Sequence, residues 1–144
     1  MIYIKSDKEI ELMRKPCAIV RDVLNLVTDK IRAGMTTKEL DKIAYDYITS
    51  CGAKPSFLGY GGFPAATCIS IDEQVVHGFP SDRIIEEDQI VSVDVGAYFN
   101  GFHGDAARSL YVGHISPEKK KLIDVTRECF FEGIKGICIG SALG

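Results

Sequence analysis

The sequence predicts an α+β fold in which an antiparallel sheet is packed against helices on one of its faces. Two segments before residue 52 repeat apolar residues with the spacing of amphipathic helices, and a third such segment follows residue 116. Between them, runs rich in Val, Ile, Tyr and Phe indicate strands, and an Asn-Gly pair between two runs predicts a tight antiparallel hairpin. Helices and strands in separate parts of a chain are typical of this class.

Length and composition are those of an ordinary globular chain. Its 144 residues are 46% hydrophobic and 26% charged, which suits a single domain over residues 1–144. The net charge of −3 and one lysine run at 119–121, interpreted as a solvated helix face, do not indicate a nucleic-acid partner. The N-terminus has no continuous apolar segment as long as that of a signal peptide or a membrane span, so we expect a cytoplasmic protein without a membrane partner.

The cysteines are odd in number, lack CxxC spacing and mostly stand among apolar residues. This pattern predicts buried free thiols in a reducing compartment rather than a disulfide framework. The five positions are Cys17, Cys51, Cys68, Cys129 and Cys138.

The first helix is predicted to begin at a capping box formed by Ser6 and Glu9. An apolar stripe follows, which we expect in the core, and Gly34 is expected to end the helix. Pro16 lies within this stretch and removes a backbone donor, so we expect either a kink or a helix that begins near it. The stripe consists of Ile10, Met13, Cys17, Val20, Leu24, Val27 and Ile31.

Two further helices have similar signals. Thr36 and Glu39 form a second capping box, and residues 51–52, Cys-Gly, close that helix. Ser116 and Pro117 fit the N-cap and first position of a third helix, which should end within residues 133–136. The apolar faces are Leu40, Ile43, Ala44, Tyr47 and Ile48 in the second helix, and Leu122, Val125, Cys129 and Phe130 in the third.

Residues 54–64 are dense in Gly, Pro and aromatic residues, and a short strand is expected at residues 67–71. Composition favours a packed surface loop over a pocket wall for the first of these segments. His77 stands between an apolar pair and a Gly-Phe-Pro turn. A histidine there is usually structural, yet a proton-handling group beside a pocket would be placed in the same way, and both interpretations stay open.

Asp94 and Asp105 lie in the predicted hairpin, residues 90–112. If Asn100-Gly101 forms a type I′ turn, the two carboxylates are diagonal neighbours on one face, roughly 7 Å apart. They can then converge on two cations about 3.5–4 Å apart, and without a cation one of them should resist ionising. Hairpin geometry alone favours a solvated polar face over a metal site. The opposite face should be core: Val91, Val93, Val95 and Ala97.

Several motifs then occur together and in order. Residues 59–82 read GYGGFPAATCISIDEQVVHGFPSD, and residues 90–113 read IVSVDVGAYFNGFHGDAARSLYVG. This combination resembles the N-terminal half of type I methionine aminopeptidases, and the resemblance extends over essentially the whole chain. It implies half of a pita-bread fold, in which two α+β halves enclose a dinuclear metal site, and it implies removal of methionine from the N-terminus of nascent polypeptides.

The resemblance also assigns residues to that site. The counterpart of Asp94 ligates one divalent ion and that of Asp105 bridges two ions, and cobalt, manganese, iron and zinc all suit such ligands. The counterpart of His77 is the catalytic residue that contacts the scissile amide. Four further positions match the pocket that receives the methionine side chain: Phe57, Tyr60, Phe63 and Cys68.

Some residues depart from the family pattern. Phe57 replaces a smaller residue and Phe63 a tyrosine, which narrows or dries the pocket. Asp72 replaces an asparagine, which puts a nearby monovalent-cation site in doubt. The second half of family enzymes supplies a His and two Glu ligands. Two carboxylates leave metal ions under-coordinated, so we expect weak metal binding and little peptidase activity from this chain by itself.

Two alternatives stay open. Another pita-bread peptidase, such as one that acts on Xaa-Pro bonds, would share the fold, although the pocket loop and the HG-x-P turn argue against it. A non-catalytic half-domain could instead cover its exposed sheet with a second copy of itself, as a homodimer in which four aspartates face one another.

Overall fold

The computed structural model describes residues 3–142 and has a four-stranded antiparallel sheet at its centre. β3 (Ile90–Phe99) pairs along its whole length with β4 (Phe102–Tyr111). Its other edge pairs with β2 (Thr67–Ile71) and with the two-residue β1 (Lys54–Pro55). β1 was not predicted, because the Gly and Pro content of residues 54–64 indicated only a loop.

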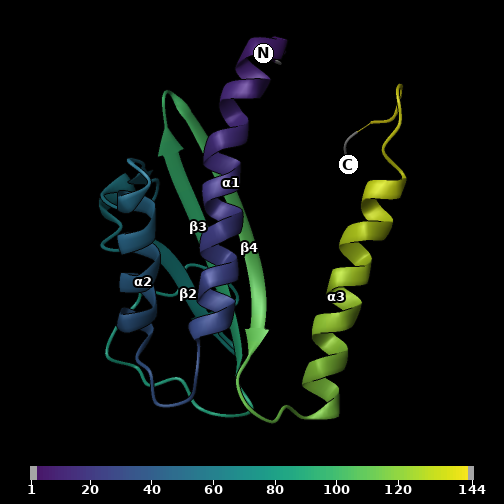
Figure 1. Ribbon diagram of the computed structural model, residues 1–144. Helices are drawn as coiled ribbons and strands as arrows, with labels where there is room; N and C mark the ends of the chain where they lie inside the picture. Colours follow the sequence, from purple (N-terminus) through teal and green to yellow (C-terminus); the bar gives the residue numbers. More distant parts are fainter. Residues whose placement is uncertain (1–2, 143–144) are drawn as a thin grey trace.

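Two helices cover one face of the sheet. α1 (Asp7–Lys30) packs on β3 and β4, and α2 (Thr37–Ser50) packs beside it on β1 and β2. α3 (Pro117–Lys135) stands apart from both (Figure 1). The predicted α+β class, with an antiparallel sheet and helices packed on one face, is confirmed. No helix among residues 3–142 is both long and apolar enough to cross a membrane.

The hairpin has the predicted turn and register. Asn100 and Gly101 have φ angles of 48° and 89°, as a type I′ turn requires, and Gly96 faces Asp105 across the two strands. The apolar face of β3 is fully buried under the helices, and each of its valines contributes roughly 1.5–3 kcal/mol by leaving water. These residues are Val91, Val93, Val95 and Ala97, each 0% exposed.

α1 begins at the predicted capping box but differs from expectation further along. The helix continues without a break through the buried Pro16 and ends at Lys30, before Gly34. A Cβ placed on Gly104 of β4 would lie 2.5 Å from the carbonyl carbon of Pro16, so the helix touches the strand backbone there. This close packing holds α1 against the sheet and offsets the hydrogen bond that proline cannot make.

Only part of the predicted α1 stripe is core. Gly104 lies near the hairpin turn, so the residues of α1 before Pro16 lie at or beyond the end of the sheet and have little to pack against. Ile10 is accordingly exposed, and Cys17 is exposed because it lies on the outward side of α1. The side chains that α1 does bury are Pro16, Ile19, Val20, Val23, Leu24 and Val27.

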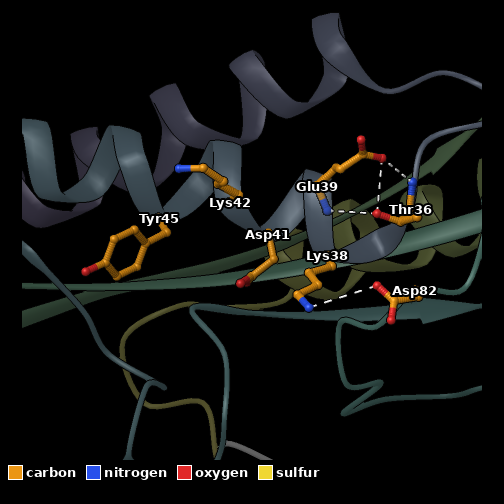
Figure 2. A pocket seen from close by; sticks show the side chains of 7 residues that line it. All are labelled: Thr36, Lys38, Glu39, Asp41, Lys42, Tyr45 and Asp82. Carbon is orange, nitrogen blue, oxygen red and sulfur yellow. Dashed lines mark hydrogen bonds and ion pairs between the residues drawn. The ribbon is translucent and has the colours of Figure 1, made fainter.

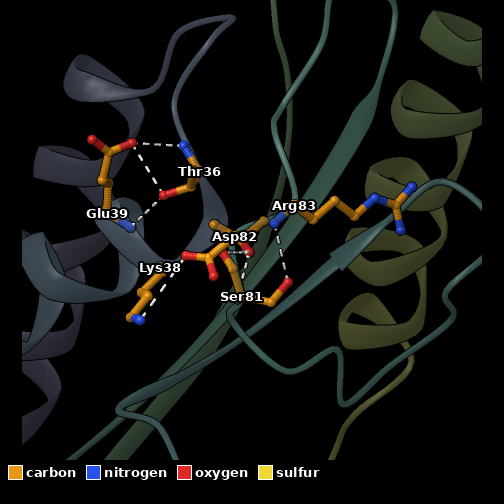
Figure 3. Close-up of polar contacts among 7 residues, drawn as sticks. Thr36, Lys38, Glu39, Ser81, Asp82 and Arg83 are labelled. Carbon is orange, nitrogen blue, oxygen red and sulfur yellow. Dashed lines mark hydrogen bonds and ion pairs between the residues drawn. The ribbon is translucent and has the colours of Figure 1, made fainter.

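The first turn of α2 holds the segment that follows His77. The predicted capping box of Thr36 and Glu39 forms, with the Glu39 carboxylate 2.7 Å from the Thr36 backbone nitrogen (Figure 3). The Thr37 hydroxyl donates to the Ser81 carbonyl and accepts from its N–H, at 3.0 and 2.8 Å. The backbone N–H groups of residues 37 and 38 donate to the carbonyls of residues 83 and 81. The segment is therefore fixed at its C-terminal end.

α3 is attached mainly through its first turn. Asp88 accepts the Ser116 N–H at 2.8 Å, and the Lys119 ammonium lies 3.3 Å from Asp72 and 3.6 Å from Asp88. The hydrogen bond from Ser116 and the charge of Lys119 hold the pKa of Asp88 below its usual value. No side chain of α3 is buried, and its apolar face, including Leu122 and Phe130 at 60% and 64% exposure, is open.

The five cysteines are free, as predicted. The expectation that they are buried is wrong for Cys17, Cys129 and Cys138, which are exposed. Cys17 lies on the outward side of α1, and Cys129 belongs to the open face of α3. Cys68 of β2 is buried, at 6% exposure.

The contact between Gly104 and α1 predicts the effect of a single methyl group. Gly104→Ala would place that group against the backbone of α1, which cannot move aside cheaply, so we expect a loss of roughly 1–3 kcal/mol in the free energy of unfolding. Urea denaturation measures it. Gly133→Ala in α3 is the matched control, because nothing lies within 4 Å of its Cβ position and alanine favours a helix. Equal loss in both variants would contradict the close contact.

Candidate metal centre

Asp94 and Asp105 lie on the face of the sheet that α1 and α2 leave open. In the register Asp94 stands between Cys68 of β2 and Ala107 of β4, and Asp105 stands opposite Gly96. The two carboxylates are thus the diagonal neighbours that the hairpin pattern predicted. Their shared face is confirmed, and their role as ligands stays a prediction.

Asp94 has a side-chain oxygen that a cation would stabilise. Its Oδ1 is buried and has no hydrogen-bond partner among the described residues. Burial raises the pKa of Asp94, and the nearby charge of Asp105 raises it further. A buried carboxylate without a partner is costly, and a divalent ion would relieve both the burial and the repulsion. The carboxylates therefore fit a hard or borderline metal ion.

The described residues supply only one side of such a centre. In residues 3–142 no group of three or more His, Cys, Asp or Glu side chains is arranged to hold a metal ion. Divalent ions of the expected kinds take five or six ligands, or four in tetrahedral sites, with a second layer of hydrogen bonds around them. Asp94 and Asp105 alone do not complete that set.

His77 and Cys68 meet Asp94 at a small pocket. This pocket of about 220 Å³ is lined by all three residues. Burial, together with the charges of Asp94 and Asp105, raises the pKa of the Cys68 thiol to about 11, so the thiol is neutral at pH 7. The structure thus brings together three residues predicted from separate parts of the sequence.

The turn that presents His77 is fixed to β2 by the residue after it. Gly78 donates to the Ser70 hydroxyl at 3.0 Å, and its carbonyl accepts the Ile69 N–H at 2.9 Å. A Cβ on Gly78 would lie 2.1 Å from the Ile69 carbonyl oxygen, so only glycine fits. His77 itself has a φ angle of 60° and is exposed above the sheet.

Aromatic side chains extend from the carboxylates along the open face. Phe57 lies directly over Gly96, where a Cβ would come within 2.7 Å of its ring. Edge-on contacts join Phe57 to Phe63 at 6.3 Å and Phe63 to Phe79 at 5.1 Å between ring centroids. Tyr60, in the short 3-10 helix η1 (Tyr60–Gly62), is 82% exposed and is not part of this row.

Phe79 was not identified from the sequence. Its place two residues after His77, in the Gly-Phe-Pro turn, was the available signal. The contact that places it in this aromatic row is with Phe63, sixteen positions earlier in the chain, and that contact depends on how the two loops fold over the sheet.

A second, polar hollow lies on α2, away from this face (Figure 2). Its charges have partners inside the protein. Asp41, whose pKa burial raises, accepts the N–H and hydroxyl of Thr67 at 2.8 and 2.7 Å, and Lys42 pairs with Asp46 at 2.7 Å. Lys38 lies 4.0 Å from Asp82. The hollow is therefore structural, and Asp41 anchors the residue that precedes Cys68.

Known proteins are similar to this chain in sequence and structure. The profile of metallopeptidase family M24 matches residues 11–144. Methionine aminopeptidases of Clostridium perfringens and Clostridium acetobutylicum are 50% and 51% identical to it, over 99% of this chain and 57% and 58% of their own lengths. The crystal structure of methionine aminopeptidase from Thermotoga maritima, 41% identical, superposes with a TM-score of 0.92 over 95% of this chain and 55% of that chain. The chain spans about half the length of these relatives.

The unpartnered Asp94 oxygen predicts how stability responds to pH and metal. The folded chain holds the Asp94 proton to higher pH than the unfolded chain does, so stability falls as the pH rises from the unfolded pKa of about 3.9 through the raised folded pKa. At pH 7 in EDTA, Asp94→Asn should therefore raise the melting temperature by roughly 2–5 °C, and at pH 3 it should have no such effect. Calorimetry measures both.

Excess Mn²⁺ should make the wild type melt at a higher temperature than Asp94→Asn at pH 7, because only the wild type has both carboxylates to bind the ion. Asp82→Asn, at a carboxylate that is 90% exposed, is the matched control and should change neither value. A lower melting temperature for Asp94→Asn in EDTA would mean that the carboxylate already has a stabilising partner.

Proposed function

This chain belongs to metallopeptidase family M24, and we propose that it forms one half of a centre that removes methionine from the N-terminus of polypeptides. The observation that carries the proposal is the buried, unpartnered oxygen of Asp94 beside Asp105, at a pocket that His77 also lines. The similarity to proteins named methionine aminopeptidase, at 50% and 51% identity, supports this substrate class over other peptidases.

In this proposal Asp94 and Asp105 hold two divalent ions, which can be cobalt, manganese, iron or zinc. Bound ions of this kind polarise a carbonyl and lower the pKa of water. His77 is the catalytic residue that contacts the scissile amide, since it stands above Asp94 at the pocket. Because His77 is exposed on the turn that Gly78 fixes to β2, its ring is free to orient the substrate.

The methionine side chain would lie among Phe57, Phe63 and the neutral thiol of Cys68. Thioethers make favourable contacts with aromatic rings and sulfur, so this lining suits methionine. Tyr60, exposed on η1, is assigned to the rim of the pocket, where it can contact the substrate from outside.

The setting proposed for this activity is a single domain, residues 1–144, in the cytoplasm, with polypeptide N-termini as partners. Its free thiols suit a reducing compartment, and its net charge of −3 gives no attraction to nucleic acid. We propose no membrane partner.

The 144-residue chain alone should bind metal weakly and act slowly. Two carboxylates leave each ion short of ligands, and the family resemblance assigns a His and two Glu to the half that this chain does not match. Isothermal titration with Mn²⁺ should show binding weaker than micromolar, and a Met-Ala peptide should be cleaved barely above background. Micromolar affinity with ordinary turnover would contradict this.

The part of the Clostridium perfringens relative that this chain does not cover supplies the positive control. Added as a separate polypeptide, it should raise cleavage of the Met-Ala peptide, and Asp94→Ala should abolish more than about 99% of that gain. An Ala-Pro dipeptide should stay intact. Cleavage of Ala-Pro in preference to Met-Ala would favour an Xaa-Pro peptidase instead.

A second candidate function is a non-catalytic half-domain that pairs with itself. The exposed apolar face of α3, and an edge strand β4 whose one partner in the described structure is β3, favour it. A homodimer through the open sheet face would cover the apolar face of α3.

Light scattering tests the self-pairing. If it occurs, the mass should double with rising concentration, and Leu122→Ser with Phe130→Ser should restore the monomer, because these side chains are 60% and 64% exposed on α3. Lys121→Ser on the same helix is the control for the loss of a long side chain. A well-folded monomer at millimolar concentration would remove this candidate.

A further inference from the structure

The side chains of the first two residues after β1 lie over the open face of the sheet at Gly96. The Ser56 N–H donates to the Gly96 carbonyl at 2.9 Å, and a Cβ on Gly96 would lie 2.8 Å from the Ser56 Cβ and 2.7 Å from the Phe57 ring. These two side chains therefore occupy the one position of β3 that has no side chain of its own. Phe57 lies there beside the carboxylates, since Gly96 faces Asp105 across the hairpin.

A side-chain hydrogen bond fastens the loop on the far side of β3. The Ser56 hydroxyl lies 2.8 Å from Nδ1 of His103 on β4, forty-seven positions later in the sequence. The hydroxyl can donate to a bare Nδ1 or accept from a protonated one, so the bond persists in either tautomer. It links the first residue of the pocket loop to the strand that carries Asp105.

His103 is itself held in place. Its ring lies 4.9 Å from that of Tyr98, its partner across the hairpin, at 50° between the planes. It shares a face of β4 with Asp105, two residues further along. The imidazole thus stands between an aromatic ring and a hydroxyl, on the face of β4 that carries the carboxylate.

We propose that Ser56 and His103 are positioning residues that set the depth of the side-chain pocket, and so its preference for a long unbranched side chain. The inference rests on the proposed function, since it assigns Phe57 to the wall of the methionine pocket. The hydrogen bond between Ser56 and His103 holds Phe57 in contact with Gly96. Edge-on ring contacts from Phe57 to Phe63 and from Phe63 to Phe79 then fix the other two rings. Without the hydrogen bond between Ser56 and His103, Ser56 keeps one polar contact among the described residues, which is its backbone hydrogen bond to the Gly96 carbonyl.

Two pairs of variants test the bond in the full chain. Ser56→Ala and His103→Gln break it, whereas Ser56→Thr keeps the hydroxyl and His103→Asn keeps a polar atom near the place of Nδ1. Hydrogen exchange of the residue 54–64 amides and NMR titration with L-methioninamide and L-alaninamide are the readouts. Slow exchange of the Val93 amide confirms folding of each variant.

The loss of one such bond corresponds to about a 2- to 10-fold change. We expect faster loop exchange and a smaller methioninamide-to-alaninamide affinity ratio, each by that factor, in Ser56→Ala and His103→Gln, with wild-type values in Ser56→Thr and His103→Asn. A wild-type preference for methioninamide that all four variants retain overturns the positioning role and leaves the proposed function standing. If the wild type shows no preference for methioninamide, the proposed methionine pocket is wrong. Faster amide exchange of the loop in Ser56→Ala and His103→Gln would then show that the bond has a structural role alone.

Discussion

The β3–β4 hairpin is in close contact with another segment on each of its two faces, and each contact is made at a glycine. On the helix side Gly104 lies against α1 at Pro16, and on the open side Gly96 lies under Ser56 and Phe57. Protein interiors are close-packed, so a methyl group at Gly104 would meet the backbone of α1, and a methyl group at Gly96 would meet the Phe57 ring and the Ser56 Cβ. The hairpin therefore locates both the helix layer and the pocket wall relative to the carboxylates that it carries.

Local signals predicted much of this arrangement. The Asn-Gly turn fixed the hairpin register and hence the shared face of Asp94 and Asp105, and both capping boxes marked where helices begin. Contacts between segments far apart in the chain could not be predicted from these local signals. The continuity of α1 through Pro16 depends on Gly104, and the place of Phe79 depends on Phe63, so neither could be read from neighbouring residues.

The geometry of the hairpin left the role of its aspartates undecided, and burial adds what the pattern lacked. On a solvated polar face, both oxygens of Asp94 would be in contact with water. Instead Oδ1 is buried without a partner among the described residues, and the pKa of the carboxyl is raised. An uncompensated carboxylate of this kind destabilises a fold unless it serves a ligand, which is why perturbed groups at pockets are candidates for function.

Two unfavourable features lie on the same side of the sheet. The carboxylates lack enough ligands for metal ions, and α3 exposes an apolar face over a groove whose opposite wall includes Ile90 and Ala107 of the open face. Each feature by itself costs free energy, the first through unsatisfied charge and the second through apolar surface in water. One covering polypeptide that brings carboxylates or imidazoles would relieve both at once. Metal binding and burial of α3 should therefore be coupled, so that whatever covers the helix also raises the affinity for metal.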